Sequence, residues 1–227
     1  MNGDSNGKFP LIGDKAPSFK AMTSMGEINF PADYRGKWIV FFSHPGDFTP
    51  VCTTEFMLFG SMQKEFDKLN TQLVGLSIGT VSSHIAWTKE IKEKIKYKGF
   101  KNIEIKFPII EDIKMEVVKK YGMIHPNASK FHTVRAVFVI DPMGKVKAIL
   151  YYPSNVGRNM SEIKRLVIAL QKSAKDNVSI PADWQPGEDV ILRTIVGQSL
   201  SKKESKKSDV YCPDWFLCFK KDKKSKK

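Results

Sequence analysis

Cysteine is scarce in this chain, with three residues among 227, at positions 52, 212 and 218. Secreted proteins that are held together by disulfides carry denser and usually even-numbered sets, so the composition argues against that class. We therefore expect a reducing interior, the cytoplasm, as the location. In such a compartment a thiol is reactive, metal-bound or simply buried.

Long apolar runs are also missing. The densest one, WIVFF at Trp38–Phe42, is far shorter than the roughly 20 residues that a membrane-spanning helix needs. The first ten residues, MNGDSNGKFP, lack a basic stretch followed by an apolar one, so we expect no secretory signal. With 41% hydrophobic and 27% charged residues, the chain has the composition of a globular protein without a membrane partner.

Arginine is rare although the chain is strongly basic, with a net charge of +13 and only five arginines among 37 basic residues. Residues 202–227 carry ten lysines against four acidic residues, which accounts for nearly half of the excess charge. Recognition of bases favours Arg, and no zinc-finger or RNA-binding motif is visible. We therefore expect a solvated basic tail and no specific nucleic-acid partner.

Short apolar segments and longer helical patterns alternate along the chain, which predicts an α/β fold with a mixed central sheet covered by helices. The predicted strands are Trp38–Ser43, Gln72–Ile78, Arg135–Asp141 and Val146–Tyr152, and the predicted helices are Thr53–Leu69, Ser82–Lys98, Lys114–Tyr121 and Ser161–Lys175. The Pro-Met-Gly-Lys segment between the last two strands predicts a hairpin. At Ser179–Val190 the composition changes to Pro and Gly, so we expect one domain at 1–177 and a C-terminal extension with little regular pattern at 178–227.

The segment FFSHPGDFTPVCTTEF, Phe41–Phe56, places a cysteine among turn and capping residues. Thr49 is a favoured N-cap and Pro50 suits the first helical position, so Cys52 is predicted at the third position of a helix. The partial positive charge of a helix N-terminus favours the thiolate, and the Thr49 hydroxyl can lie beside the sulfur. The alternative is a buried, inert cysteine in a strand-to-helix turn, but the surrounding pattern favours a reactive thiolate.

Three segments together resemble the peroxiredoxin family. SHPGDFTPVCTTE closely resembles its active-site signature, P-x-x-x-T-x-x-C, and the His before the Pro is similar to the branch called one-cysteine peroxiredoxins. TVRAVFVIDP resembles the strand with the family's catalytic arginine, here Arg135, and YYPSNVGRNMSEI resembles the segment with a second active-site arginine, here Arg158. The resemblance extends from about Pro10 through the C-terminal extension.

The resemblance implies a thioredoxin-like fold and the reduction of hydrogen peroxide or an organic hydroperoxide. Cys52 would be the peroxidatic residue, whose thiolate attacks the peroxide and becomes a sulfenic acid. Thr49 would hydrogen-bond the peroxide, and Arg135 would favour the thiolate and stabilise the leaving oxygen. Pro45 would shield the sulfenic acid, and the backbone N–H groups of Val51 and Cys52 would complete the pocket. No metal and no organic cofactor are needed.

Two further residues of the signature are open to two interpretations each. His44 is either a pocket residue that tunes or contacts the thiol, or a histidine at a strand end that is bonded to the backbone. Glu55 either holds Arg158 in place or simply benefits the dipole of its helix.

The tail segment YCPDWFLCFKK places Cys212 and Cys218 six residues apart among three aromatic residues. The C-x-x-C pairs and His partners of a zinc site are missing, and a structural disulfide is not expected in a reducing compartment. Archaeal-type members of the one-cysteine branch resemble this chain in carrying such a pair. That resemblance implies a resolving thiol from a neighbouring subunit, with Cys218 favoured over Cys212, a thioredoxin-like reductant, and a homodimer or a ring of dimers.

Three other functions compete with this hypothesis. GLSIG, Gly75–Gly79, matches the G-x-S-x-G pattern of serine hydrolases, but Ser77 is predicted inside a strand and no triad partners are recognisable. A thiol-disulfide oxidoreductase would carry C-x-x-C, and Thr53 and Thr54 offer Cys52 no partner. A redox-sensing or chaperone-like ring, in which oxidation of Cys52 switches assembly, would bind clients without consuming peroxide.

Overall fold

The computed structural model describes residues 9–193 and 209–222. Contacts divide the chain into two compact units, Met1–Met160 and Ser161–Lys227. This division falls at the start of helix α5 (Met160–Asp176), whereas the composition places the domain boundary after residue 177. The last predicted helix therefore groups with the C-terminal extension.

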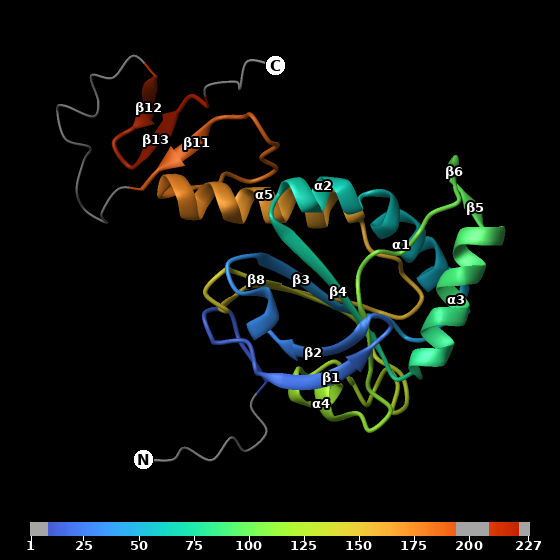
Figure 1. The fold of residues 1–227 in the computed structure, drawn as a ribbon. Coiled ribbons are helices and arrows are strands. Elements are labelled where there is room, and N and C mark those ends of the chain that lie inside the picture. Colours follow the sequence, from blue (N-terminus) through green and yellow to red (C-terminus); the bar gives the residue numbers. More distant parts are fainter. Residues whose placement is uncertain (1–8, 194–208, 223–227) are drawn as a thin grey trace, which may run out of the picture. The chain divides into compact units, whose positions relative to one another are not determined.

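A seven-stranded mixed sheet forms the first unit, in the order β2-β1-β7-β4-β3-β8-β9 (Figure 1). Parallel pairing joins β3 to β4 and β4 to β7, and the other neighbours are antiparallel. Its strands are β1 (Phe19–Thr23), β2 (Gly26–Phe30), β3 (Trp38–Ser43), β4 (Thr71–Ser77), β7 (Ile109–Glu111), β8 (Arg135–Ile140) and β9 (Val146–Tyr152). A separate hairpin pairs β5 (Lys96–Tyr97) with β6 (Phe100–Lys101). The predicted mixed sheet and the β8–β9 hairpin are confirmed.

Helices lie on both faces of this sheet, with α1 and α2 on one face and α4 on the other (Figure 1). They are α1 (Pro50–Ser61), α2 (Gln63–Lys68), α3 (Val81–Lys94) and α4 (Glu116–Lys120), and a short 3-10 turn covers Ala32–Tyr34. The single helix predicted at Thr53–Leu69 is two helices that meet at Met62. The helix predicted to reach Lys98 ends at Lys94, because Ile95 is extended and leads into β5.

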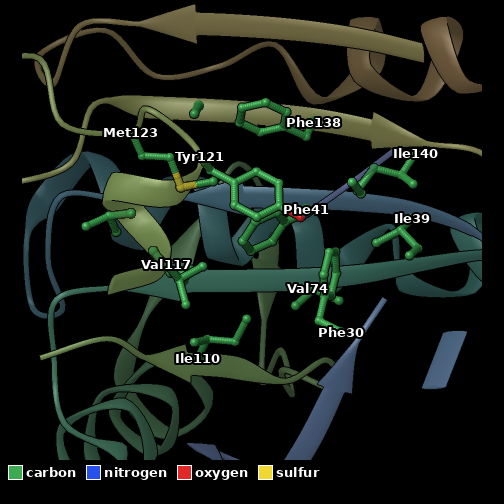
Figure 2. Packing of buried hydrophobic residues seen from close by; sticks show 14 of the residues in the cluster. Phe30, Ile39, Phe41, Val74, Ile110, Val117, Tyr121, Met123, Phe138 and Ile140 are labelled. Carbon is green, nitrogen blue, oxygen red and sulfur yellow. The ribbon is translucent and has the colours of Figure 1, made fainter. Parts of the chain in front are cut away.

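Strand β3 is buried on both faces, as its continuous apolar sequence predicts for an inner strand. On one face Phe41 packs with Tyr121 and Phe138 in the large core cluster (Figure 2). On the other face the ring of Phe42 stacks on Phe59 of α1, with 4.4 Å between the ring centroids. The sheet and α1 are thus joined by aromatic packing just beside the turn that carries the signature.

The second unit combines α5 with a small antiparallel sheet in the order β10-β11-β13-β12. Its strands are β10 (Val178–Ser179), β11 (Val190–Leu192), β12 (Val210–Asp214) and β13 (Leu217–Lys220). Ala169 of α5 packs with Val178, Trp184 and Val190 in a core of its own. The expectation of little regular pattern was wrong, because strands of two to five residues are too short to show a clear alternation.

Candidate active site

Cys52 lies in the first turn of α1, at the position that the sequence predicts. The helix begins at Pro50, and Thr49 is its N-cap in an extended conformation (φ −100°, ψ 144°). The Thr49 hydroxyl does not cap the helix, because it donates to the carbonyl oxygen of Gly46 at 2.8 Å. The thiol of Cys52 is free of any disulfide and fully buried. The partial positive charge of the helix N-terminus therefore faces this sulfur.

Arg135 brings a cation to this sulfur from the first residue of β8. Its Nη1 lies 3.3 Å from Cys52 Sγ and donates to Glu55 Oε2 at 2.8 Å. On its other side the carbonyl oxygen of Ser154 accepts from Nε at 3.0 Å and from Nη2 at 2.6 Å. The guanidinium is 2% exposed and is held from both sides, so its orientation toward the sulfur is fixed.

Glu55, one turn after Cys52, lies between two arginines. Arg158 donates to it from Nε at 2.9 Å, from Nη2 at 2.6 Å and from its backbone N–H at 2.8 Å. Burial alone would raise the pKa of Glu55, but Arg158 and Arg135 outweigh that effect and hold the pKa below its usual range. Two buried guanidinium groups thus share one carboxylate, and the excess positive charge lies beside Cys52. Of the two interpretations of Glu55, the structure supports the contact with Arg158.

His44 is fully buried immediately after β3. Its Nε2 lies 2.9 Å from Asp47 Oδ1, and its Nδ1 has no hydrogen-bond partner among the residues that the structure describes. Burial lowers the pKa of His44, against the opposing effect of Asp47. The side chain of His44 therefore bonds to a carboxylate. The alternative interpretation, in which His44 is bonded to the backbone, is not what the described residues show.

Asp47, whose side chain is 4% exposed, and the fully buried His84 belong to this region but were not predicted from the sequence. Asp47 Oδ2 accepts from Ser83 Oγ at 2.6 Å and lies 2.8 Å from His84 Nδ1. Burial alone would raise the pKa of Asp47, but hydrogen bonds from His44, His84 and Ser83 lower it well below its usual range. Asp47 lies within the quoted segment SHPGDFTPVCTTE, so its place in that segment could have marked it as a candidate site residue. His84 lies 37 residues away, and the sequence offers no sign that the two meet.

The remaining residues predicted for the pocket lie on the loop that joins β3 to α1. Pro45, Thr49 and Val51 are half-buried on this loop and the first turn, next to the fully buried Cys52. The loop also carries Phe48, which is 57% exposed and has a positive φ of 56°. The fold is not needed to bring four of the predicted residues together, because they are close in the sequence: Pro45, Thr49, Val51 and Cys52. Arg135 and Arg158 are distant in the sequence and reach this region only through the fold.

Ser77 of the GLSIG segment is not arranged as a hydrolase nucleophile. It is the last residue of β4 and is 1% exposed, and its hydroxyl has no partner in the described part of the chain. The nearby His84 uses Nδ1 toward Asp47 and Nε2 toward the carbonyl oxygen of Ile110, at 3.2 Å. No ring nitrogen of His84 is left to activate a serine, which agrees with the rejection of the hydrolase hypothesis.

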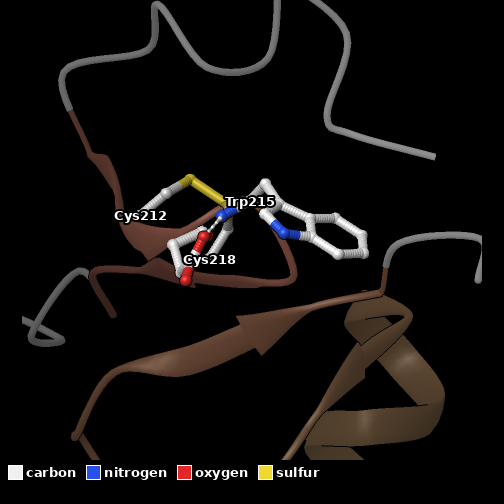
Figure 3. The surroundings of a disulfide bond; sticks show 4 residues. Cys212, Trp215 and Cys218 are labelled. Atoms are coloured by element: carbon white, nitrogen blue, oxygen red, sulfur yellow. Dashed lines mark hydrogen bonds between the residues drawn. A yellow bond between two sulfur atoms is a disulfide. The ribbon is translucent and has the colours of Figure 1, made fainter. Parts of the chain in front are cut away.

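Cys212 and Cys218 form a disulfide across the β12–β13 hairpin, with an S–S distance of 2.03 Å (Figure 3). This bond was not expected from the sequence, because a reducing compartment disfavours it and the hairpin that brings the two residues together was not predicted. Within residues 9–193 and 209–222, no group of three or more His, Cys, Asp or Glu is arranged to hold a metal ion. Over the same residues, no helix has the length and apolar character required to cross a membrane.

Comparisons with known proteins agree with this geometry. Residues 12–149 match the AhpC/TSA family, and residues 169–204 match the C-terminal domain of 1-Cys peroxiredoxin. A peroxiredoxin of Methanosarcina mazei is 62% identical over 219 residues, which cover 94% of this chain and 99% of that protein. A peroxiredoxin of Thermotoga maritima is 49% identical, with 95% and 99% covered.

Solved structures show the same relationship. A yeast mitochondrial 1-Cys peroxiredoxin, studied for thiol resolution via glutathione/thioredoxin systems, matches with a TM-score of 0.80 at 41% identity and covers 93% of this chain and 99% of its own. A cysteine-to-serine mutant of peroxiredoxin 6 of Arenicola marina matches with a TM-score of 0.82 at 33% identity, with 95% and 99% covered. The thioredoxin-like fold is thereby confirmed, and the chain belongs to the peroxiredoxin family of thiol peroxidases.

Proposed function

We propose that Cys52 is the peroxidatic residue and reduces hydrogen peroxide and organic hydroperoxides. The observation that supports this most strongly is the 3.3 Å contact between Arg135 Nη1 and Cys52 Sγ at a helix N-terminus. The thiolate attacks the terminal oxygen of the peroxide, so that an S–O bond forms, the O–O bond breaks and Cys52 becomes a sulfenic acid. The departing oxygen takes up a proton and leaves as water or alcohol.

The neighbours of Cys52 have separate roles in this step. Arg135 orients the peroxide and stabilises the negative charge that develops on the leaving oxygen. Thr49 and the backbone N–H groups of Val51 and Cys52 hydrogen-bond the peroxide, and Pro45 shields the sulfenic acid. His44, Glu55 and Arg158 are supporting residues. The hydrogen bonds from Arg158 to Glu55 support the role of Glu55 as the group that holds both arginines.

We further propose that the tail cysteines complete the cycle. Cys218, or Cys212 in its place, attacks the sulfenic acid, which forms a disulfide with Cys52 and releases water. The second tail thiol then displaces Cys52 and leaves the Cys212–Cys218 disulfide, which is the pairing present in the structure. A thioredoxin-like dithiol protein reduces this disulfide and becomes oxidised itself.

The resolving thiol is proposed to come from a neighbouring subunit of a homodimer, or of a ring of dimers, in the cytoplasm. Exposed aromatic side chains beside the disulfide, Trp215 and Phe216, offer a surface for packing on another subunit. Mixing Cys52→Ser/Cys212→Ser protomers, which keep only Cys218, with Cys212→Ser/Cys218→Ser protomers, which keep only Cys52, tests this. A Cys52–Cys218 disulfide between the two species in a non-reducing gel would support the proposal. No such band in the mixture, together with a Cys52–Cys218 disulfide within single protomers of Cys212→Ser, would contradict it.

Stopped-flow peroxide consumption tests the catalytic assignment with Cys52→Ser, Cys212→Ser and Cys218→Ser. We expect Cys52→Ser to lack the rapid phase, because it removes the sulfur that Arg135 Nη1 contacts at 3.3 Å. Loss of the resolving cysteine should spare the first turnover and block recycling by thioredoxin. A fast peroxide-dependent phase that survives in Cys52→Ser would overturn the assignment.

A further inference from the structure

Asp47 lies at the centre of a buried cluster next to the helix that carries Cys52. It joins His44 and His84 through its two carboxylate oxygens, at 2.9 Å and 2.8 Å, and both imidazole rings are fully buried. The ring of His44 also contacts Phe56 of α1 and Trp87 of α3, with centroid distances of 4.7 Å and 5.2 Å. The cluster therefore fixes the His44 ring against the first turns of α1.

The partners of Asp47 determine where the proton of His44 resides. A carboxylate only accepts hydrogen bonds, so His44 must present an N–H at Nε2. Burial lowers the pKa of His44 and so favours the neutral ring. His84 and Arg158 lower this pKa further. A neutral imidazole carries one proton, so Nδ1 must present a lone pair. This nitrogen is one of three buried side-chain atoms without a hydrogen-bond partner among the described residues. Buried acceptors without partners are rare, so this nitrogen keeps a lone pair that no described residue uses.

The two groups that face the ring nitrogens of His84 suit a positively charged ring. Its Nδ1 faces Asp47 Oδ2 and its Nε2 faces the carbonyl oxygen of Ile110, and both of these groups are acceptors. An imidazole can donate from both nitrogens only as the imidazolium ion. The pair of His84 and Asp47 is then neutral as a whole, which removes the cost of burying a lone carboxylate next to His44.

We propose that Asp47 and His84 are positioning residues that hold His44 as the Nε2–H tautomer, so that its Nδ1 stays an acceptor in the peroxide site. The proposal rests on the proposed function of Cys52 for its effect on rate, but the ring protonation that it predicts does not. Neither Asp47 nor His84 reacts with the peroxide. Each acts only through the ring of His44.

Nitrogen-15 NMR of protein labelled at its four histidines tests the ring protonation directly. In the wild-type protein we expect one neutral ring with its proton on Nε2, assigned to His44 by the His44→Gln variant, and one doubly protonated ring, assigned to His84. Asp47→Asn should turn its oxygen to His44 and its amide to His84, because the other orientation would leave a buried imidazolium without a counter-charge. His84 then loses a proton and His44 keeps its tautomer. A wild-type His44 with its proton on Nδ1 would overturn the proposal.

The rate of Cys52 oxidation tests whether Asp47 acts through His44. Asp47→Ala should slow the first turnover by about 10²-fold, the lower end of the range for a lost acid–base contact. Asp47→Asn should lose much less, since it still accepts from His44. In the His44→Gln background, Asp47→Ala should cause no further loss. An equal loss in both backgrounds would contradict the proposal. The exposed His132→Gln variant serves as the control for rate and spectra.

The two assays separate the possible failures. Wild-type protein without a fast peroxide phase would refute the proposed function of Cys52, and the NMR spectra would still decide the tautomer. Asp47→Ala could lose its rate through unfolding, so its thermal transition is measured alongside, and the wild-type spectrum requires no variant to fold.

Discussion

Cys52 and the Cys212–Cys218 pair differ in exposure: Cys52 is fully buried, whereas Cys212 is exposed, although its partner Cys218 is only 2% exposed. Cys52 contacts Arg135, and Glu55 binds both Arg135 and Arg158. The tail pair instead bridges a two-stranded hairpin whose turn exposes Trp215 and Phe216, 61% and 59% respectively (Figure 3). The difference matches the chemistry that each sulfur is proposed to perform. A thiolate needs a fixed cation, whereas a disulfide that is reduced by another protein needs access.

Glu55→Gln should produce the largest change. It removes the only carboxylate that Arg135 and Arg158 share in the described part of the chain, and breaking a buried ion pair costs about 3–5 kcal/mol. We expect the free energy of unfolding in urea to fall by this amount. Glu104→Gln, which removes an exposed partner of Lys92, is the matched control and should change it far less. Equal effects of the two substitutions would show that burial does not strengthen the network.

Arg135→Lys should have the next largest effect, on rate more than on stability. Lysine keeps the charge but cannot reach Cys52, Glu55 and the Ser154 carbonyl together, as the planar guanidinium does. We expect stopped-flow oxidation of Cys52 to slow by about 10²-fold, as is typical when a donor to a developing negative charge is lost. Arg165→Lys, an exchange outside the site, should leave the rate unchanged, and a comparable loss there would contradict the assignment.

Opening the tail disulfide should have a smaller and more local effect. The bond closes a loop with a sequence separation of six, so its loss should destabilise the hairpin by about 2 kcal/mol. Cys212→Ser should therefore increase hydrogen exchange in β12 and β13 and leave exchange at α1 unchanged. Increased exchange around Cys52 would mean that the two sulfur sites are not independently stabilised.

Acid should lower the free energy of unfolding, with a modest slope against pH that comes from Glu55. The folded pKa of Glu55 is held below the ordinary value of 4.5, so the stabilisation is present above that pH and is lost as the pH falls toward the folded pKa. One group contributes at most about 1.4 kcal/mol per pH unit. Urea unfolding between pH 6 and 3 should therefore show the gap in unfolding free energy between wild type and Glu55→Gln narrowing below about pH 4.5. Parallel curves would exclude Glu55 as the titrating group.

Local patterns were enough to locate much of the site. The strands Trp38–Ser43 and Val146–Tyr152 have the predicted bounds, because buried inner strands and hairpins carry strong local signals. The helix start at Pro50 was predicted from capping chemistry, although the Thr49 hydroxyl bonds to Gly46. The short strands β10 to β13 were missed, because pairing with neighbours and not local alternation creates them.

The sequence by itself determined that a cysteine sits at the positive end of a helix after a buried strand, because caps and apolar runs act over a few residues. Its motifs also identified Arg135 and Arg158. Only the tertiary structure decided that Glu55 lies between these arginines, and that Asp47 meets a histidine 37 residues away. It also decided that Cys212 and Cys218 face each other across a hairpin. Such contacts depend on which strands pair and which helices pack on them, and no short stretch of the chain carries that information.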